Sequence, residues 1–227
     1  MNKSYKVTIL VFSIFLMATS MIFAQNNGTS FSGGINAIIT DIEKRNIDTI
    51  EKEGILLMRE EEKLARDVYL ALYDQWNLKI FYNIAQSEKT HMEAIKLLLD
   101  RYGIEDPVGE DIIGTFENER LQTLYDELVA KGSQSLEQAL SASATVEELD
   151  IYDLKELLGK TDNDDIKIVY QNLLKGSRNH LRSFNKQLEG RGIAYSAQYL
   201  SQKEYDDLAA SPQEREGAIS QPDFVYQ

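Results

Sequence analysis

Four long stretches of the chain carry apolar residues at the three- and four-residue spacing of a helix face, and this feature constrains the fold most. The stretches cover residues 50–76, 80–102, 136–158 and 164–189. Strand-like alternation of apolar and polar residues is nearly absent, and the chain contains only three prolines, which would interrupt helices. The sequence therefore predicts an all-α protein.

The lengths of the connections indicate how these helices are joined. The joins near Asn77 and over residues 160–163 are short, so each should link two antiparallel neighbours. The connection over residues 103–135 is long enough to run the length of a bundle, and it contains a shorter helical piece at 117–130. We therefore expect a four-helix domain over residues 50–200, with two antiparallel hairpins joined by one long crossover that contains a short helix.

Both ends of the chain differ from this helical middle. Residues 1–24 have a basic start, an apolar run and small residues before the end, which predicts a signal peptide cleaved after Ala24 and an exported protein, periplasmic or extracellular. An uncleaved membrane anchor is the alternative. Residues 25–49 should hold a flexible leader and a helical segment that starts near Ile35. Residues 201–227 should form a C-terminal extension, made of a short helix and a polar tail that is exposed or partly ordered.

Net charge and cysteine content exclude several classes of protein. The formal net charge of −13 argues against nucleic acid or anionic lipid as a partner, because clustered Lys and Arg bind both. The same charge is compatible with attracting metal ions. The chain has no cysteine, so it lacks disulfides, a lipid-attachment cysteine and a rubredoxin-type iron site. Beyond the N-terminal segment no stretch is apolar enough to cross a membrane, and the sequence leaves homo-oligomer formation open.

The chain has only two histidines, and each lies in a helical stretch beside acidic residues on the same face. Glu88 and His91 share a face with Ile84 and Ile95, so both side chains should point into the core. Burying a carboxylate together with an imidazole is costly unless their charges and hydrogen bonds are compensated, and a metal ion compensates both. A structural Glu–His pair without metal is the alternative.

The other three long helices each place a polar residue in a comparable position. Glu60, Glu61 and Glu62 follow one another, and at least one must point inward because neighbouring helix positions lie about 100° apart. Periodicity alone does not choose between Glu61 and Glu62. Glu147 is the single acidic interruption of an apolar face, and His180 lies in the middle of another. Every long helix therefore offers a candidate metal ligand near its centre.

Three phrases of the sequence resemble motifs of known proteins. The run from Glu62 to Tyr69, Glu-Lys-Leu-Ala-Arg-Asp-Val-Tyr, resembles the first-helix signature of rubrerythrins and ferritins, in which a ligand Glu is followed by Ala three residues on and Tyr seven residues on. Glu88-x-x-His91 resembles the second-helix motif, and Glu147 followed by Tyr152 resembles the bridging glutamate of the third helix. His180 occupies the histidine position of the fourth helix.

The chain thus resembles the ferritin-like di-iron carboxylate superfamily, and residues 56–200 are similar to an uncharacterised bacterial and archaeal ferritin-like family. The resemblance implies a ferritin-like four-helix bundle that binds one or two ions of iron, manganese or zinc. It also implies a redox protein acting on oxygen or peroxide, and whether the chain is an enzyme stays open. A non-enzymatic envelope scaffold with a degenerate metal site is the alternative. The implied metal ligands are Glu62, Glu88, His91, Glu147 and His180.

The sequence departs from the superfamily pattern in its last long helix. Ser177 stands where that helix should supply a glutamate, and a hydroxyl is a much weaker ligand for a divalent metal. The site is therefore expected to hold one ion, or two with water or Asp150 filling in. An inward-pointing Arg178 would repel a metal. Tyr69 and Tyr152 are interpreted first as amphipathic core tyrosines, with hydrogen bonding to ligands or radical chemistry as the alternative.

Overall fold

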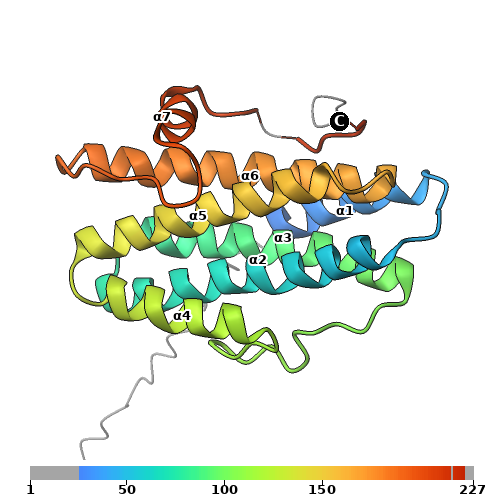
Figure 1. Ribbon diagram of the computed structural model, residues 1–227, viewed down its shortest axis with the longest axis horizontal. Coiled ribbons are helices and arrows are strands. Elements are labelled where there is room, and N and C mark those ends of the chain that lie inside the picture. Colours follow the sequence, from blue (N-terminus) through green and yellow to red (C-terminus); the bar gives the residue numbers. More distant parts are fainter. Residues whose placement is uncertain (1–25, 216, 223–227) are drawn as a thin grey trace, which may run out of the picture.

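The computed structural model describes residues 26–215 and 217–222, and within them the chain forms helices and no strand (Figure 1). The predicted all-α class is confirmed. The predicted signal peptide, with its cleavage after Ala24, lies outside the described residues. No helix in the described part of the chain is long and apolar enough to span a membrane. The helices are α1 Asn26–Thr40, α2 Thr49–Trp76, α3 Lys79–Tyr102, α4 Glu119–Gly132, α5 Leu136–Leu158, α6 Asp164–Glu189 and α7 Gln202–Ala210.

The four longest helices pack along one another (Figure 1). α2 packs on α3 and α5 packs on α6, and each pair is joined by a short connection. The two pairs meet through contacts of α2 with α5 and of α3 with α6. α4 lies against α2 and α5, so the crossover from α3 to α5 runs along one side of the molecule. This arrangement brings the middles of the four long helices around one interior region.

Local signals in the sequence set the ends of several helices. Asp48 begins α2 with a capping box, because its side chain accepts from the backbone N–H of Glu51 while the Glu51 side chain accepts from the backbone N–H of Asp48. Asn118 caps α4 and Ser135 caps α5, and in each case the side chain accepts a hydrogen bond from a backbone N–H of the first helical turn. Asn77 ends α2 in the left-handed conformation, with φ of 50°. These caps place the helix ends close to the positions that apolar spacing predicts.

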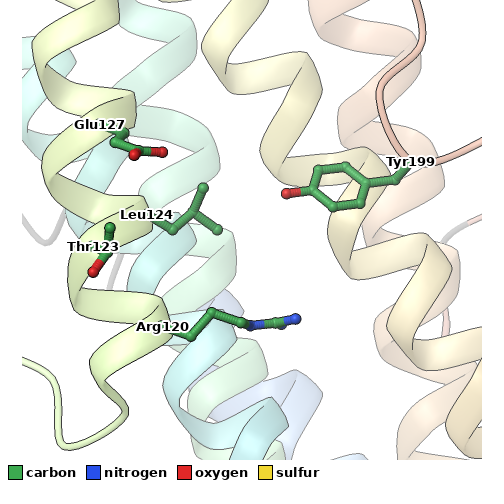
Figure 2. A pocket seen from close by; sticks show the side chains of 5 residues that line it. All are labelled: Arg120, Thr123, Leu124, Glu127 and Tyr199. Atoms are coloured by element: carbon green, nitrogen blue, oxygen red, sulfur yellow. The ribbon is translucent and has the colours of Figure 1, made fainter.

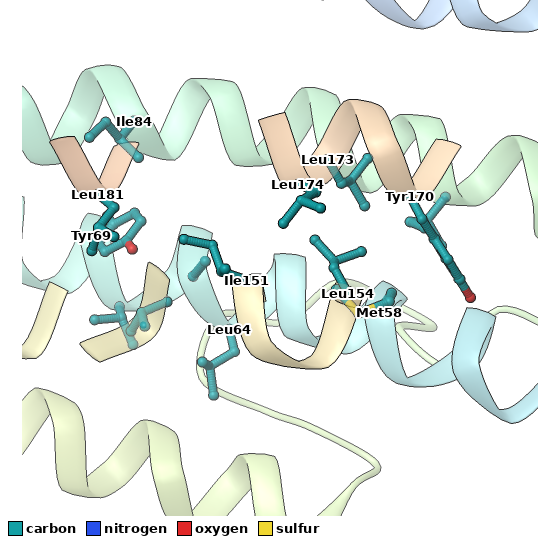
Figure 3. Close-up of a cluster of buried hydrophobic side chains, with 14 of the residues drawn as sticks. Met58, Leu64, Tyr69, Ile84, Ile151, Leu154, Tyr170, Leu173, Leu174 and Leu181 are labelled. Carbon is teal, nitrogen blue, oxygen red and sulfur yellow. The ribbon is translucent and has the colours of Figure 1, made fainter. Parts of the chain in front are cut away.

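The apolar core lies between the long helices, and all four contribute to it (Figure 3). Met58 and Leu64 from α2, Leu154 from α5 and Leu173 from α6 are fully buried or nearly so. Burial of this apolar surface is the main force that holds the helices together. The core also fixes the register of the polar side chains that interrupt its faces.

The N-terminal helix differs from its prediction. Composition predicts a flexible leader up to residue 34, whereas α1 begins at Asn26. Gly33 and Gly34 lower the helix propensity of this segment by about 1 kcal/mol each. Packing offsets that cost, because Ile35 and Ile39 are buried and α1 contacts both α3 and α6. The helix therefore depends on tertiary contacts that the local sequence does not reveal.

The C-terminal tail is held against α6 rather than fully exposed. Glu214 accepts hydrogen bonds from Arg178 Nε at 2.7 Å and from Arg182 Nη2 at 3.0 Å. Further along, Ile219 and Asn172 exchange two hydrogen bonds, from the Ile219 backbone N–H at 2.8 Å and to the Ile219 carbonyl oxygen at 3.1 Å. The polar tail, which the sequence predicts to be exposed or partly ordered, is thus partly docked.

Charged residues of α2 hold the crossover against the long helices. Arg59, Lys63, Arg66 and Asp67 are buried although all four are charged, because each bonds to a partner in the crossover segment 103–118. Paired burial of this kind avoids the cost of an unpaired interior charge. The contacts are Arg59 with Asp106 at 2.9 Å, Lys63 with the Ile112 carbonyl at 2.8 Å, Arg66 with Asp111 at 2.7 Å, and Asp67 with the Gly114 N–H at 3.0 Å.

Candidate metal centre

The five residues predicted as metal ligands converge in the interior, at the point where the four long helices meet. Their exposed fractions range from 0% for Glu62 and Glu88 to 9% for His180. The donor atoms form two groups, and within each group they lie no more than 4.8 Å apart. One group contains Glu62, Glu88 and His91, and the other contains Glu88, Glu147 and His180. The two groups share Glu88.

Glu88 lies between the two imidazoles. Its Oε2 is 2.7 Å from Nδ1 of His91, and its Oε1 is 2.8 Å from Nδ1 of His180. Glu62 Oε2 lies 3.2 Å from Nδ1 of His91, and Glu147 Oε2 lies 3.6 Å from Nδ1 of His180. The family resemblance pointed to Glu147 as the bridging carboxylate, but here Glu147 belongs to one group only. The carboxylate shared by both groups is Glu88.

Several donor atoms of the centre are buried without a hydrogen bond. These atoms are Glu62 Oε1, both carboxylate oxygens of Glu88, Glu147 Oε2 and His180 Nδ1. The short contacts between Glu88 and the imidazoles therefore bring the atoms close without the geometry of a hydrogen bond. Each unsatisfied buried polar group costs about 1–3 kcal/mol. Carboxylate oxygens and imidazole nitrogens aimed at shared interior points fit a divalent metal such as iron, manganese or zinc.

Burial and mutual charge shift the pKa values across the centre. Burial raises the pKa of Glu62 to about 7, although His91 opposes the shift, and burial likewise raises the pKa of Glu147 to about 7 against the effect of His180. Burial alone would lower the pKa of His180, but Glu88 and Glu147 raise it to about 10. Against burial, His180 and His91 hold the pKa of Glu88 below its usual range. Protons thus occupy this cluster in the metal-free protein, and a bound cation would replace them.

Two further side chains orient the candidate ligands. Tyr69 donates its hydroxyl proton to Glu147 Oε1 at 2.5 Å, while its ring packs on Phe184. Ser87 Oγ is 3.0 Å from Nε2 of His180. Tyr69 therefore combines the core role that the sequence favours with a hydrogen bond to a candidate ligand. Tyr152 does neither, because it is 44% exposed, and its interpretation as a core residue is wrong.

Gly176 leaves the space that the His91 ring occupies, and the sequence analysis missed it. A Cβ atom at Gly176 would lie 2.4 Å from Cε1 and 2.5 Å from Nε2 of His91. Phe31 of α1 approaches the same ring, with 6.0 Å between ring centroids. A glycine inside a long helical pattern, one residue before Ser177, was the available signal, because glycine in a helix interior costs stability and usually has a packing reason.

Ser177, which stands where the superfamily pattern has a glutamate, and its neighbour Arg178 also have defined partners. Ser177 Oγ donates to Asp150 Oδ2 at 2.9 Å, and Asp150 is only 3% exposed. Arg178 pairs with Glu214 of the tail, with its Nη2 2.6 Å from Oε2. This pairing directs the guanidinium toward the tail, so the predicted repulsion of a metal by Arg178 does not arise.

The three consecutive glutamates of α2 are all buried, and each has a different environment. Glu60 accepts a hydrogen bond from the backbone N–H of Glu117 at 2.7 Å and so ties the segment before α4 to α2. Glu61 Oε1 is 3.0 Å from Nη2 of Arg120, whereas Glu62 lies in the centre. The structure thus separates Glu61 from Glu62, which periodicity alone does not.

A surface groove lies apart from this centre, between α4 and the segment that follows α6 (Figure 2). It encloses about 330 Å³ and is lined by Arg120, Thr123, Leu124, Glu127 and Tyr199. None of the candidate metal ligands lines it. The groove therefore gives no direct access to the two groups that contain Glu88.

Comparisons with known proteins find one family and one relative with a solved structure. Residues 51–212 match the family model described as "Uncharacterized protein domain (DUF2202)". The uncharacterized protein MJ0754 of Methanocaldococcus jannaschii is 54% identical over 177 residues, which make up 78% of this chain and 96% of the relative. The crystal structure of hypothetical protein MJ0754 matches with a TM-score of 0.75 and 53% identity, covering 77% of this chain and 99% of that chain. None of these descriptions states a function.

Proposed function

The chain belongs to the family of the uncharacterized protein domain DUF2202, and on this premise we propose that it is an exported, ferritin-like metal-binding protein. In this proposal α2, α3, α5 and α6 form a ferritin-like four-helix bundle. Two metal ions bind between these helices, one in each group that contains Glu88. Iron is the first candidate, and manganese and zinc suit the same mixed set of oxygen and nitrogen donors.

One observation carries the proposal: five buried donor atoms of the two groups have no hydrogen-bond partner. A polar network that served only structure would be expected to satisfy its members, because half-satisfied interior networks are costly. The short distances of Glu88 to both imidazoles add to this, since they bring an imidazole nitrogen of each group within 2.8 Å of one carboxylate. A cation at each group would satisfy the carboxylate oxygens and the imidazole nitrogens together.

The surrounding residues have clear tasks in this proposal. Bound iron or manganese would supply one-electron redox chemistry toward oxygen or peroxide. Glu62 and Glu147 would each hold one ion, and Glu88 would contribute a carboxylate oxygen to each group. Tyr69 fixes the orientation of Glu147 and holds a proton beside it, and Ser87 fixes the ring of His180. The burial of Glu62, Tyr69, Glu88 and Glu147 keeps bulk water away from the centre.

The proposal also covers where the protein acts and how its charge affects the approach of metal ions. The signal-peptide pattern of residues 1–24 supports a location outside the cytoplasm, where the chain would meet metal ions and oxygen. The net charge of −13 favours the approach of cations over that of nucleic acid or anionic lipid. Whether the protein turns over a substrate depends on an electron donor, because the chain has no cysteine-bound iron site of its own.

Metal analysis tests the proposal directly. The protein is purified without chelator, and bound iron, manganese and zinc are measured for wild type, for Glu88→Ala/His91→Ala and for the exposed control Glu137→Ala. We expect about two ions per chain in wild type and control, and loss of metal in the double variant. Substoichiometric metal that the double variant leaves unchanged would remove the proposal and favour a non-enzymatic scaffold with a degenerate site.

A second measurement separates a redox protein from a passive metal binder. The metal-loaded protein is reduced without oxygen, and its consumption of oxygen or peroxide is then followed. A redox protein consumes the oxidant in proportion to its bound iron or manganese, and Glu88→Ala/His91→Ala consumes none. If the reduced protein stays reduced in the presence of oxygen and of peroxide, it binds metal but has no redox activity toward these oxidants.

A further inference from the structure

We propose that Asp150 supplies the fourth carboxylate of the metal centre, in place of the one that α6 lacks at Ser177. This inference rests on the proposed function. It answers a question that the sequence leaves open, because a serine hydroxyl is too weak a ligand to replace a glutamate. The replacement would come from the neighbouring helix α5 rather than from α6.

The positions of four residues on two helices support this assignment. Glu147 and Asp150 are three residues apart on α5, so their side chains lie on one face of that helix. Ser177 and His180 have the same spacing on α6. Ser177 Oγ donates to Asp150 Oδ2 at 2.9 Å, so the carboxylate of Asp150 contacts the residue that stands at the glutamate position of the pattern.

The short side chain of Ser177 is what makes room for this arrangement. Ser177 is fully buried and Asp150 is 3% exposed, so the pair belongs to the interior. A glutamate at 177 would extend into the space that Asp150 approaches from α5. The hydroxyl of Ser177 uses one carboxylate oxygen of Asp150, and a carboxylate has a second oxygen to offer to an ion. Hydrogen bonding of this kind commonly holds metal-binding carboxylates in place.

The charges around Asp150 also fit a bound cation. Burial and the carboxylates of Glu62, Glu61, Glu147 and Glu88, in that order, raise the pKa of Asp150. No Lys, Arg or His is among the groups that act most strongly on it. A buried carboxylate without a positive partner is costly, and a metal ion would provide that partner.

Charge balance gives an independent reason for a fourth carboxylate. Two divalent ions carry four positive charges, while Glu62, Glu88 and Glu147 provide three negative ones and neutral imidazoles provide none. Asp150 makes the sum zero. A net charge in the interior is unfavourable, so a two-metal centre without Asp150 would hold its second ion weakly.

Metal stoichiometry of matched variants tests the inference. Metal-free protein is titrated with Mn²⁺, unbound metal is removed, and the bound metal per chain is measured. The variants are Asp150→Asn, which keeps the size of the side chain and can still accept from Ser177, and the control Asp153→Asn on the same helix. Asp153 pairs with Arg120 at 3.3 Å, so it already has a positive partner. Circular dichroism of each metal-free variant checks that the helices are retained.

We expect two Mn²⁺ ions per chain in wild type and in Asp153→Asn. In Asp150→Asn we expect one ion to bind as before and the affinity of the second to fall by about 100-fold or more. Swapping the two residues, in Asp150→Ser/Ser177→Glu, should restore the second ion, because it returns a carboxylate to α6 and frees the space that Asp150 fills. This rescue would not follow if Asp150 only held the helices together.

The failures of this inference and of the proposed function are distinguishable. If wild type binds no Mn²⁺ and no other metal, the proposed function fails. If wild type and Asp150→Asn both bind two ions with the same affinity, Asp150 is not a ligand, while the proposed function stands. A wild type that binds only one ion would also overturn the role of Asp150, because no second position would then exist.

Discussion

Glu88 differs from the other candidate ligands, because each of its carboxylate oxygens lies beside a different imidazole. Glu62 and Glu147 each approach only one of them. A single substitution at Glu88 should therefore disturb both groups, and one at Glu62 should disturb a single group. The asymmetry follows from the geometry and does not depend on which metal binds.

Replacing Glu88 should abolish binding of both ions, whereas replacing Glu62 should weaken only one. An amide oxygen carries no net charge and is a poorer ligand than a carboxylate oxygen. Isothermal titration of Mn²⁺ into Glu88→Gln and Glu62→Gln measures both stoichiometry and affinity. Two tight ions in Glu88→Gln would show that Glu88 is not shared, and similar losses in both variants would remove the asymmetry.

Gly176 is the second residue with an effect that can be stated in advance. In Gly176→Ala the new methyl group would meet the His91 ring at 2.4 Å, so the ring must move. We expect a loss of about 1–3 kcal/mol in the free energy of unfolding from overpacking, together with weaker binding of the ion beside Glu62 and His91. Urea unfolding and Mn²⁺ titration measure the two effects.

Gly159→Ala is the matched control for Gly176→Ala. Gly159 follows α5 with φ of −73°, and a Cβ atom there would meet only ordinary contacts, the nearest at 3.6 Å. Both its stability and its metal binding should stay close to wild type. Normal metal binding in Gly176→Ala would contradict this expectation, because the His91 ring could then move without losing its place as a ligand.

At the scale of whole elements, the crossover depends on charge pairs that acid should break. Arg59 keeps the pKa of Asp106 low against the effect of burial, and Arg66 lowers the pKa of Asp111. A folded-state pKa below the unfolded value means that these pairs stabilise the protein above the ordinary pKa of Asp, about 3.9. That stability is lost as the pH falls through the lowered pKa values.

We therefore expect residues 103–118 to detach before the long helices unfold as the pH falls below about 4. Both carboxylates are partly exposed, so each pair should contribute at most about 1 kcal/mol. Hydrogen exchange at a series of pH values locates the change. Asp106→Asn/Asp111→Asn should show the weakened crossover already at pH 7, whereas the exposed control Asp207→Asn should not. Equal protection of this segment at pH 3 and pH 7 would contradict the expectation.

Prediction from the sequence succeeds where the signal is local. Apolar spacing and side chains such as Asp48 and Asn118 place the long helices and their ends, because each helix end is decided within one turn. The start of α1 was missed, since its glycines make a poor helix in isolation and contacts of Ile35 and Ile39 across the molecule stabilise it. The docked tail depends likewise on partners in α6 that lie far away in the sequence.

The same distinction holds for the candidate centre. The spacing of Glu88 and His91 on one helix face indicates that both point inward, and the family resemblance chose Glu62 over Glu61. The sharing of Glu88 and the pairing of Ser177 with Asp150 depend on how two helices are placed side by side. Spacing within one helix carries no information about that placement, so the sequence did not predict the sharing of Glu88 and named Asp150 only as an alternative to water.

On the scale of the whole molecule, the centre exists only when all four long helices are assembled, because each supplies at least one candidate ligand. Metal should therefore bind the folded chain and stabilise it. The gain per ion is about 2.7 kcal/mol at a free metal concentration 100 times the Kd, so each ion corresponds to a rise in Tm of roughly 5–10 °C for a domain of this size. Calorimetry with and without Mn²⁺ measures the shift.

Glu88→Ala/His91→Ala is the control for the thermal measurement, because it removes a shared ligand and a second ligand from the centre. Its Tm should not respond to Mn²⁺, whereas the Tm of Glu137→Ala should rise as in wild type. A rise of the same size in the double variant would show that the ions stabilise the protein through surface carboxylates. A chain with a net charge of −13 has many of these.

Anomalous scattering from a crystal grown with excess iron or manganese tests the central claim most directly. We expect two peaks at the metal absorption edge, one beside Glu62 and His91 and one beside Glu147 and His180, with Glu88 between them. Each ion should lie about 2.0–2.5 Å from its ligand atoms. The absence of anomalous density at these positions, with Glu88 and both imidazoles hydrogen-bonded to one another or to water, would contradict the proposed metal centre.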